Sequence, residues 1–443
     1  MGAPPTHADA FDGRPDEVTC DDVRADRDDS PATGKGSGFP FSVILVSVVA
    51  VMAHTALPTP VYAIYRREFG LTTLQVTEVY AIYALGVIAA LVLFNSLSHT
   101  IGRRPLLLIG LICSAASNAV FLCADSLGHL FVARLLTGLA AGTFMGTATV
   151  AAVEVAPRRF ARHAAVGATA ANIFGLGIGP VIGGLGTQFL NAPEHQLFLC
   201  HLAAVVVLAV LLLTTREPLP RDARVPFRWT APKPPSADRL TYAGLTLTGV
   251  SGMATLGMLA GLTPHFLDTF YPRSTGLAAG LIVGGGFGGS ALAQLAFQRM
   301  TISRGLAAGA AVMSAGLLVL TAAILFGSGV LYTCAAVFTG LGQGLAIGRS
   351  IQEISTRTAH AERVSAVNLY YVALYTGAAV PVIALAFLEK AYGLSTAGLA
   401  FCGFALAFCA TGIVQLIRAG MWRGAPTAGD GTGAGPAGPD DRA

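Results

Sequence analysis

Long apolar segments separated by short polar stretches recur along the chain from Phe41 to Ile417. Each has about 20 or more residues, enough for a helix to cross a hydrocarbon layer roughly 30 Å thick. The pattern predicts an all-α membrane protein with twelve transmembrane helices. The predicted spans are residues 40–65, 74–97, 104–124, 128–153, 163–190, 196–215, 240–265, 275–298, 304–326, 329–352, 364–389 and 394–417.

Polar segments divide this series into two halves. The basic, proline-rich stretch 216–239 is expected to link a six-helix bundle at 40–215 to a second one at 240–418. Contact of its basic residues with anionic lipid is an alternative role. Residues 1–39 hold nine acidic and four basic residues and no apolar core, so they predict a disordered tail rather than a cleaved signal peptide. Residues 419–443 predict a second disordered tail.

The two halves show an internal repeat. T-G-L-A-A-G-T-F-M-G at 137–146 matches T-G-L-G-Q-G-L-A-I-G at 339–348, with Thr, Gly, Leu, Gly and Gly at the same places. The fourth and tenth segments are therefore predicted to be counterparts in two pseudo-symmetric bundles. In transporters built from such repeats, the substrate site lies at the repeat interface near the middle of the membrane.

Basic residues in the short loops predict the orientation. Cytoplasmic loops carry an excess of Lys and Arg. Loops after even-numbered segments carry more of them, so both termini are expected in the cytoplasm, at a bacterial plasma membrane. The residues are Arg103, Arg104, Arg158, Arg159, Arg162, Arg299, Arg304, Arg357 and Arg363, against Arg66, Arg67, Arg273 and Lys390 in the opposite loops.

The fifth segment is unusually rich in glycine. It reads N-I-F-G-L-G-I-G-P-V-I-G-G from Asn172 to Gly184. Spacings of three and four place Asn172, Gly175, Gly179 and Gly183 on one helix face, which predicts close approach of a neighbouring helix. Pro180 removes a backbone donor and is expected to bend the helix.

Three stretches resemble signatures of the major facilitator superfamily, and within it the twelve-helix drug:proton antiporters. N-S-L-S-H-T-I-G-R-R at 95–104 is similar to the family's loop signature, and R-L-L-T-G-L-A-A-G at 134–142 to its fourth-helix pattern. G-L-G-I-G-P-V-I-G-G at 175–184 is similar to the fifth-helix signature that the family associates with export by antiport. The resemblance covers about residues 40–420 and implies alternating access between two six-helix bundles.

The loop signature departs from the family at Asn95, His99 and Thr100, where the family has Gly, an acidic residue and Arg. His99 stands where the family has an acid that helps to latch the two halves, while Gly102, Arg103 and Arg104 remain. Glu154 could pair with Arg103 or Arg104. A weakened or pH-sensitive latch is one hypothesis, because histidine titrates near pH 6.5; a drifted loop with other contacts is the alternative.

Arg134 is the sharpest single candidate for coupling. An Arg at membrane depth costs roughly 2.5 kcal/mol or more, so it should face a cavity or a partner. Gly138 and Gly142 follow at four-residue intervals. The resemblance implies a part for Arg134 in proton or substrate coupling; the alternative is a side chain that extends to the membrane surface.

Membrane carboxylates that could carry protons are sparse. His54, in the middle of the first segment, is the best alternative carrier, although a packing role is the commoner one for a lone buried histidine. Glu78 and Glu154, near segment ends, are the further candidates. Polar and aromatic residues at mid-segment depth are candidates for a substrate cavity that suits an amphiphilic organic molecule: Asn172, Gln294, Gln343, Asn368, Tyr371 and Tyr375.

Motifs for other functions are missing from the sequence. G-G-G-F-G-G at 284–289 has no flanking strand, and no nucleotide, metalloprotease or nucleophile-elbow motif occurs. The chain is therefore predicted to be a monomeric transporter rather than an enzyme, without cofactor, metal or nucleic-acid partner, that exports a small amphiphilic compound in exchange for protons. A sugar or metabolite uniporter or importer, and a transport-inactive receptor or scaffold, are the alternatives.

Overall fold

The computed structural model describes residues 38–94, 97–217, 231–270 and 276–422. Its regular elements in these ranges are helices, and 12 of them are long and apolar enough to span a membrane. The prediction of an all-α membrane protein with twelve spans is confirmed. The predicted tails are too long: α2 begins at Gly38, and Trp422 donates to the Ser303 carbonyl oxygen at 3.2 Å. Residues 1–37 and 423–443 lie outside the described residues, so their expected disorder stays a prediction.

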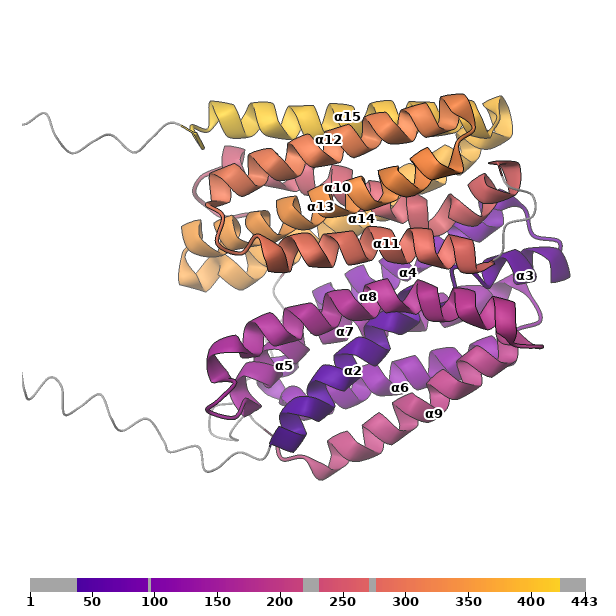
Figure 1. Cartoon of the computed structure of the whole chain (residues 1–443). Helices are drawn as coiled ribbons and strands as arrows, with labels where there is room; N and C mark the ends of the chain where they lie inside the picture. The colour runs from indigo at the N-terminus through magenta and orange to yellow at the C-terminus, as the bar shows by residue number, and fades with distance from the viewer. Residues whose placement is uncertain (1–37, 95–96, 218–230, 271–275, 423–443) are drawn as a thin grey trace, which may run out of the picture.

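The two halves of the chain form two bundles, the lower and the upper one in Figure 1. The first half contains α2 (Gly38–Ala56), α3 (Tyr62–Glu68), α4 (Thr73–Phe94), α5 (Leu97–Thr100), α6 (Arg103–Leu122), α7 (Leu127–Val155), η1 (Ala161–His163), α8 (Ala164–Phe189) and α9 (Pro193–Thr214). The second half contains α10 (Arg239–Phe270), α11 (Gly276–Ala296), α12 (Ile302–Phe326), α13 (Gly329–Arg357), α14 (His360–Tyr392) and α15 (Leu394–Arg418).

The first predicted span, 40–65, is not one continuous helix. Helix α2 ends at Ala56, a turn follows, and the chain becomes helical again as α3. Pro58 and Pro60 explain the break, because proline lacks a backbone N–H and disfavours helical geometry in the residue before it. In contrast, Pro180 lies inside the uninterrupted helix α8.

Glycine packing repeats between the two halves. A Cβ at Gly138 of α7 would collide with the carbonyl oxygen of Tyr83 on α4. At the matching position of the repeat, a Cβ at Gly340 of α13 would collide with the carbonyl oxygen of Gly286 on α11. Helices α7 and α13 thus pack in equivalent ways on α4 and α11, which is the relation that the sequence repeat predicts.

The halves meet along two pairs of helices, α4 with α14 and α8 with α11. Each half also places a tyrosine in the apolar core of the other. Tyr80 of α4 belongs to a core cluster of the second half, and Tyr375 of α14 to a cluster of the first. These two tyrosine rings therefore connect the apolar cores of the two halves across the interface.

The contact between α8 and α11 is tightest toward one end. We call the end where Gly38 and Trp422 lie the terminal side, and the opposite end the far side. Toward the far side, a Cβ at Gly184 would lie 2.8 Å from the Leu277 Cα, whereas a Cβ at Gly288, nearer the terminal side, meets nothing within 4 Å. The two helices diverge toward the terminal side (Figure 1), so the halves are closed together on the far side.

The described end of the predicted linker before α10 is bound to the second bundle. The Ser236 backbone N–H and hydroxyl both donate to Glu362 at 3.0 Å. Asp238 pairs with Arg357 at 2.9 Å. Residues 218–230 of the linker lie outside the described residues, so contact with lipid stays a prediction.

Candidate functional site

Arg134 lies two turns into α7 with only 1% of its surface exposed. Its Nη1 donates a hydrogen bond of 2.7 Å to the carbonyl oxygen of Thr55, just before α2 ends. Because the guanidinium is enclosed, the alternative in which it extends to the membrane surface is wrong. Gly138 and Gly142 have no side chains, so α7 packs tightly on α4. This close packing brings Arg134 against that helix.

Three tyrosine rings surround the Arg134 guanidinium. Its central carbon lies 4.7 Å from the ring centre of Tyr83, 5.8 Å from Tyr80 and 5.9 Å from Tyr62. A cation within about 6 Å of a ring centre is attracted by the negative π face, more strongly where water is excluded. The rings therefore stabilise a buried charge that would otherwise be costly. We call Arg134 with these three tyrosines the arginine cage.

The cage does not neutralise the arginine. Among the described residues, no carboxylate forms an ion pair with Arg134. Its Nε is buried without a hydrogen-bond partner. The site thus holds a fixed positive charge, three aromatic rings and one buried donor without a hydrogen-bond partner.

The cage is continuous with the second half of the molecule. The rings of Tyr83 and Tyr375 meet edge to face with centres 6.0 Å apart. The Tyr375 hydroxyl also donates to the Met145 sulfur at 3.3 Å. Tyr371 packs against the same core cluster of the first half. Two of the predicted cavity residues therefore lie at the interface.

The other predicted cavity residues are more dispersed. Asn368 Nδ2 and Gln343 Oε1 are buried without hydrogen-bond partners. Gln343 packs on Gly252 of α10, inside the second half. Gln294 donates to Ser290 of its own helix at 3.4 Å, and Asn172 is half-buried on α8. Their part in substrate binding stays a prediction.

The glycines of α8 lie on two faces of the helix, and each face packs on a different neighbouring helix. Gly175, Gly179 and Gly183 pack on α2, where added Cβ atoms would collide with backbone or Cβ atoms from Val49 to Leu57. This is the close approach that their spacing predicts. The opposite face meets α11: Gly184 lies against Leu277, and a Cβ at Gly280 would strike the carbonyl oxygen of Pro180. Helix α8 thus joins its own bundle to the other one.

The loop signature forms a compact polar site on the terminal side. Arg103 pairs with Glu154 at 3.4 Å, as the sequence suggests. Sequence reasoning missed Glu217, whose carboxylate accepts hydrogen bonds from the backbone N–H groups of Arg103 at 2.7 Å and Arg104 at 2.9 Å. These contacts lie within the first half. The His99 side chain lies outside the described residues, so the latch hypothesis stays a prediction.

His54 is buried inside the first bundle. Its ring stacks on His201 of α9 at 4.5 Å, and Nδ1 lies 3.3 Å from the Ser114 hydroxyl on α6. Both neighbours belong to its own bundle, which supports a packing role. Glu78 is half-buried in the first turns of α4. The proposed carrier roles of both residues stay predictions.

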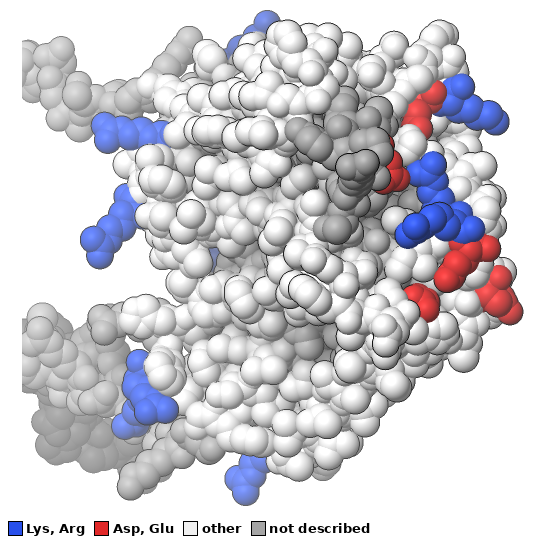
Figure 2. All heavy atoms as spheres, turned by 45° about the vertical axis from the view of Figure 1, so that its right-hand side comes forward, with Lys and Arg blue, Asp and Glu red and all other residues white. Residues whose placement is uncertain are grey.

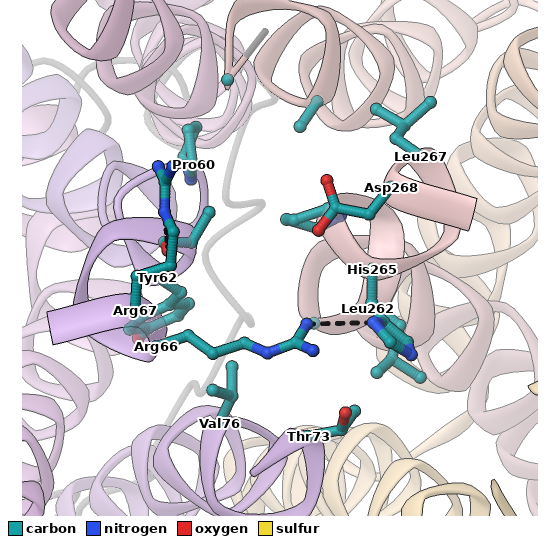
Figure 3. A pocket seen from close by; sticks show the side chains of 15 residues that line it. Pro60, Tyr62, Arg66, Arg67, Thr73, Val76, Leu262, His265, Leu267 and Asp268 are labelled. Atoms are coloured by element: carbon teal, nitrogen blue, oxygen red, sulfur yellow. Dashed lines mark hydrogen bonds between the residues drawn. The ribbon is translucent and has the colours of Figure 1, made fainter. Parts of the chain in front are cut away.

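A cavity of about 350 Å³ opens between the halves on the far side. Arg66 of α3 extends across it toward His265 of α10 (Figure 3), with 3.0 Å between Nη1 and Nδ1. The His265 Nε2 lies 2.8 Å from Glu389 of α14. Tyr62 lines this cavity as well as the arginine cage. The sequence analysis did not identify this cluster. Its one indication in the sequence is that Arg66, His265 and Glu389 each lie at or directly after the end of a predicted span.

The described residues contain no group of His, Cys, Asp and Glu side chains that could hold a metal ion. The described cysteines are free thiols. Nothing in the described part of the chain therefore forms a disulfide or a metal centre.

Comparison with known proteins identifies the family. Residues 43–382 match the model of the Major Facilitator Superfamily. The chain belongs to this superfamily. Two solved transporters share its fold: a bacterial homologue of the human lysosomal transporter Spinster, inward-facing and unoccupied (TM-score 0.67, 16% identity, 86% of this chain and 98% of that one), and a mutant of the nucleoside transporter NupG (TM-score 0.67, 12% identity, 85% and 99%).

Drug-resistance proteins are among its relatives in sequence. The class B tetracycline resistance protein of Escherichia coli is 31% identical over 140 residues, which cover 31% of this chain and 33% of that protein. The quinolone resistance protein NorA of Staphylococcus aureus (strain MRSA252) is 24% identical over 261 residues, 58% of this chain and 65% of NorA. Each alignment covers less than two thirds of the relative. The family match and the 12 candidate spans show a multi-pass membrane protein of this superfamily.

Proposed function

We propose that the protein exports a small amphiphilic organic compound in exchange for protons, by alternating access, as a monomer. The observation that carries this proposal is the arginine cage, where a buried, unneutralised charge and three tyrosines meet the boundary between the halves. Such a site combines apolar contact with one strong polar anchor, as sites for small organic ligands do. The glycine signature of α8 and the resistance proteins among the relatives support export of a drug or secondary metabolite.

The terminal side is proposed to face the cytoplasm of a bacterial cell. Arg103, Arg104, Arg158 and Arg159 lie at this side, and the charged residues visible there in Figure 2 are Lys or Arg. Acidic and basic residues lie together at the far side in that view. An excess of Lys and Arg in short loops marks the cytoplasmic side. The halves are then closed toward the exterior.

Reconstituted proteoliposomes test the function. An imposed proton gradient should drive accumulation of an amphiphilic dye, and collapse of the gradient should abolish it. Arg134→Gln should lose this accumulation, whereas Arg239→Gln, at the start of α10 and outside the cage, should keep it. Accumulation that ignores the gradient would eliminate antiport and favour a uniporter or importer. Absence of any flux across a broad panel of amphiphiles, sugars and nucleosides would favour the transport-inactive receptor or scaffold.

A further inference from the structure

Two short contacts connect three side chains at the far-side cavity. Arg66 Nη1 lies 3.0 Å from His265 Nδ1, and His265 Nε2 lies 2.8 Å from Glu389 Oε1. Arg66 belongs to the first half, whereas His265 and Glu389 both belong to the second. The first contact (Figure 3) therefore ties the two halves together, and the second lies within one half.

These contacts determine where the histidine proton lies. Arginine is a donor only, so the Nδ1 that faces Arg66 must act as an acceptor. His265 is then a neutral imidazole whose Nε2–H donates to the Glu389 carboxylate. In this form a single ring bridges a cation of one half and an anion of the other.

We propose that His265 is a proton-binding site and that proton binding there opens the far side. A second proton on Nδ1 turns the acceptor into a donor that faces the Arg66 guanidinium. The hydrogen bond between the halves is lost, and two cations then face each other. The imidazolium meanwhile binds Glu389 more strongly, since both partners now carry charge. The proton thus converts a bridge between the halves into an ion pair within the second half.

The cavity gives the proton a route to this site. Arg66 and His265 both line the cavity, together with Tyr62 of the arginine cage. Histidine is the side-chain type whose charge ordinarily changes between about pH 5 and pH 8, a range that an acidified exterior reaches. Opening at this end would connect the exterior with the cage.

Nearby charges set the pH at which the contact opens. Positive neighbours disfavour the imidazolium and carboxylates favour it. Asp268 of α10 also faces the cavity (Figure 3), so Asp268→Asn should move opening to lower pH. The described titratable groups around this end of α10 include Asp268 of α10, Tyr62, Tyr65, Arg66, Arg67 and Glu68 of α3, Glu78 and Tyr80 of α4, Tyr332 of α13, Glu389 and Lys390 of α14, and Cys402 of α15.

The part of this site in transport rests on the proposed function, in which the far side faces an acidic exterior. An antiporter that exports its substrate must take up a proton from outside. A site that opens outward as it binds that proton would release substrate and load the proton in the same state. Proton binding and substrate binding then both depend on which of the two states the protein adopts. Each ligand therefore changes the affinity of the protein for the other.

Pulsed electron spin resonance distances test the inference. Spin labels would be placed on exposed Glu68→Cys of α3 and Tyr392→Cys of α14, in a cysteine-free chain in nanodiscs. Between pH 8 and pH 5 the ratio of long to short distances should rise at least about tenfold, as for a ligand that favours one state by ~1.4 kcal/mol. His265→Gln, whose amide can accept from Arg66 and donate to Glu389 but does not titrate, should keep the short distance at both pH values.

Two further variants sharpen the result. Arg66→Leu removes the donor from the first half and should give the long distance at both pH values. His195→Gln, which removes an exposed histidine outside the cavity, should respond to pH as the parent does. A parent that does not respond, or a His265→Gln variant that responds like the parent, would overturn the inference. The measurement needs neither substrate nor gradient, so a pH response without antiport in proteoliposomes would reject the proposed function alone.

Discussion

The guanidinium carbon of Arg134 lies 4.7 Å from the centre of the Tyr83 ring. Tyr83 in turn meets Tyr375 of the other half at 6.0 Å. The Tyr83 ring therefore links the buried charge to the boundary between the bundles. A rearrangement of the halves that moves Tyr375 would change the surroundings of the arginine.

Two substitutions of Tyr83 should distinguish the contribution of its ring from that of its hydroxyl. A desolvated cation–π contact contributes about 2 kcal/mol, so Tyr83→Leu should weaken substrate affinity or transport efficiency by about thirtyfold. Tyr83→Phe keeps the ring that faces Arg134, so its transport should stay within about twofold of the parent. Initial rates of gradient-driven dye transport in proteoliposomes would measure both.

Tyr392→Leu is the matched control for this pair, because Tyr392 is 69% exposed at the end of α14. Its transport should equal that of the parent. Equal losses for Tyr83→Phe and Tyr83→Leu would assign the effect to the hydroxyl and contradict a role for the ring in stabilising Arg134.

The burial of Arg134 was predictable, but its surroundings were not. Segment length and charge depletion predict the helices, and an arginine at membrane depth predicts an enclosed site. The three tyrosines come from α3 and α4, and α3 exists because Pro58 and Pro60 interrupt the first span. Periodicity along one segment carries no information on which rings converge from other segments, so the cage required three-dimensional packing.

The closure between α8 and α11 should depend on Gly280. A Cβ there would collide with the Pro180 carbonyl oxygen. Gly280→Ala should therefore push the helices apart, at about 1–3 kcal/mol for overpacking. This destabilises the state closed on the far side and should lower its population at least about fivefold. The same spin-label distances between α3 and α14 would report the shift.

Gly288→Ala is the control on the same helix, since an added Cβ there meets nothing within 4 Å. Its distance distribution should match that of the parent. If Gly280→Ala also matched the parent, close packing at Pro180 would not be what holds the far side closed.

Gly102 should be intolerant of a side chain. Its φ of 107° lies in the region that favours glycine, and an added Cβ would come within 2.7 Å of the Glu217 carboxylate carbon. Gly102→Ala should cost about 1–3 kcal/mol of stability from backbone strain alone. Displacement of Glu217 from the N–H groups of Arg103 and Arg104 adds to this cost. Thermal unfolding in detergent should show a lower midpoint than for the parent.

The comparison variant is Gly403→Ala in α15, where an added Cβ meets nothing within 4 Å and φ is not positive. Alanine is favoured over glycine inside a helix by about 1 kcal/mol, so this change should be neutral or stabilising. A Gly102→Ala protein as stable as Gly403→Ala would show that Glu217 moves aside without cost.

Gly102 and Glu217 also show where sequence reasoning stops. The loop signature identifies Gly102, Arg103 and Arg104, and charge pairing suggests Glu154. Glu217 lies more than a hundred residues further on, at the edge of a linker whose composition predicts an unstructured connection. Its role follows only from the way α9 brings the linker back to the start of α6. The same limit applies to Arg66, His265 and Glu389, which three separate spans bring together.

His54→Gln decides between a proton carrier and a packing residue. The ring stacks on His201 and contacts Ser114, both within the first bundle. A polar substitution in this buried site should cost about 1–3 kcal/mol of stability, while gradient-driven transport per folded molecule keeps its dependence on pH. Stability would be read from thermal unfolding, and coupling from proton uptake that accompanies dye transport. If proton uptake vanished while substrate still crossed the membrane, the packing role would be wrong. The first half would then contain its own proton site, separate from His265, and the two variants combined would show whether the sites act in sequence.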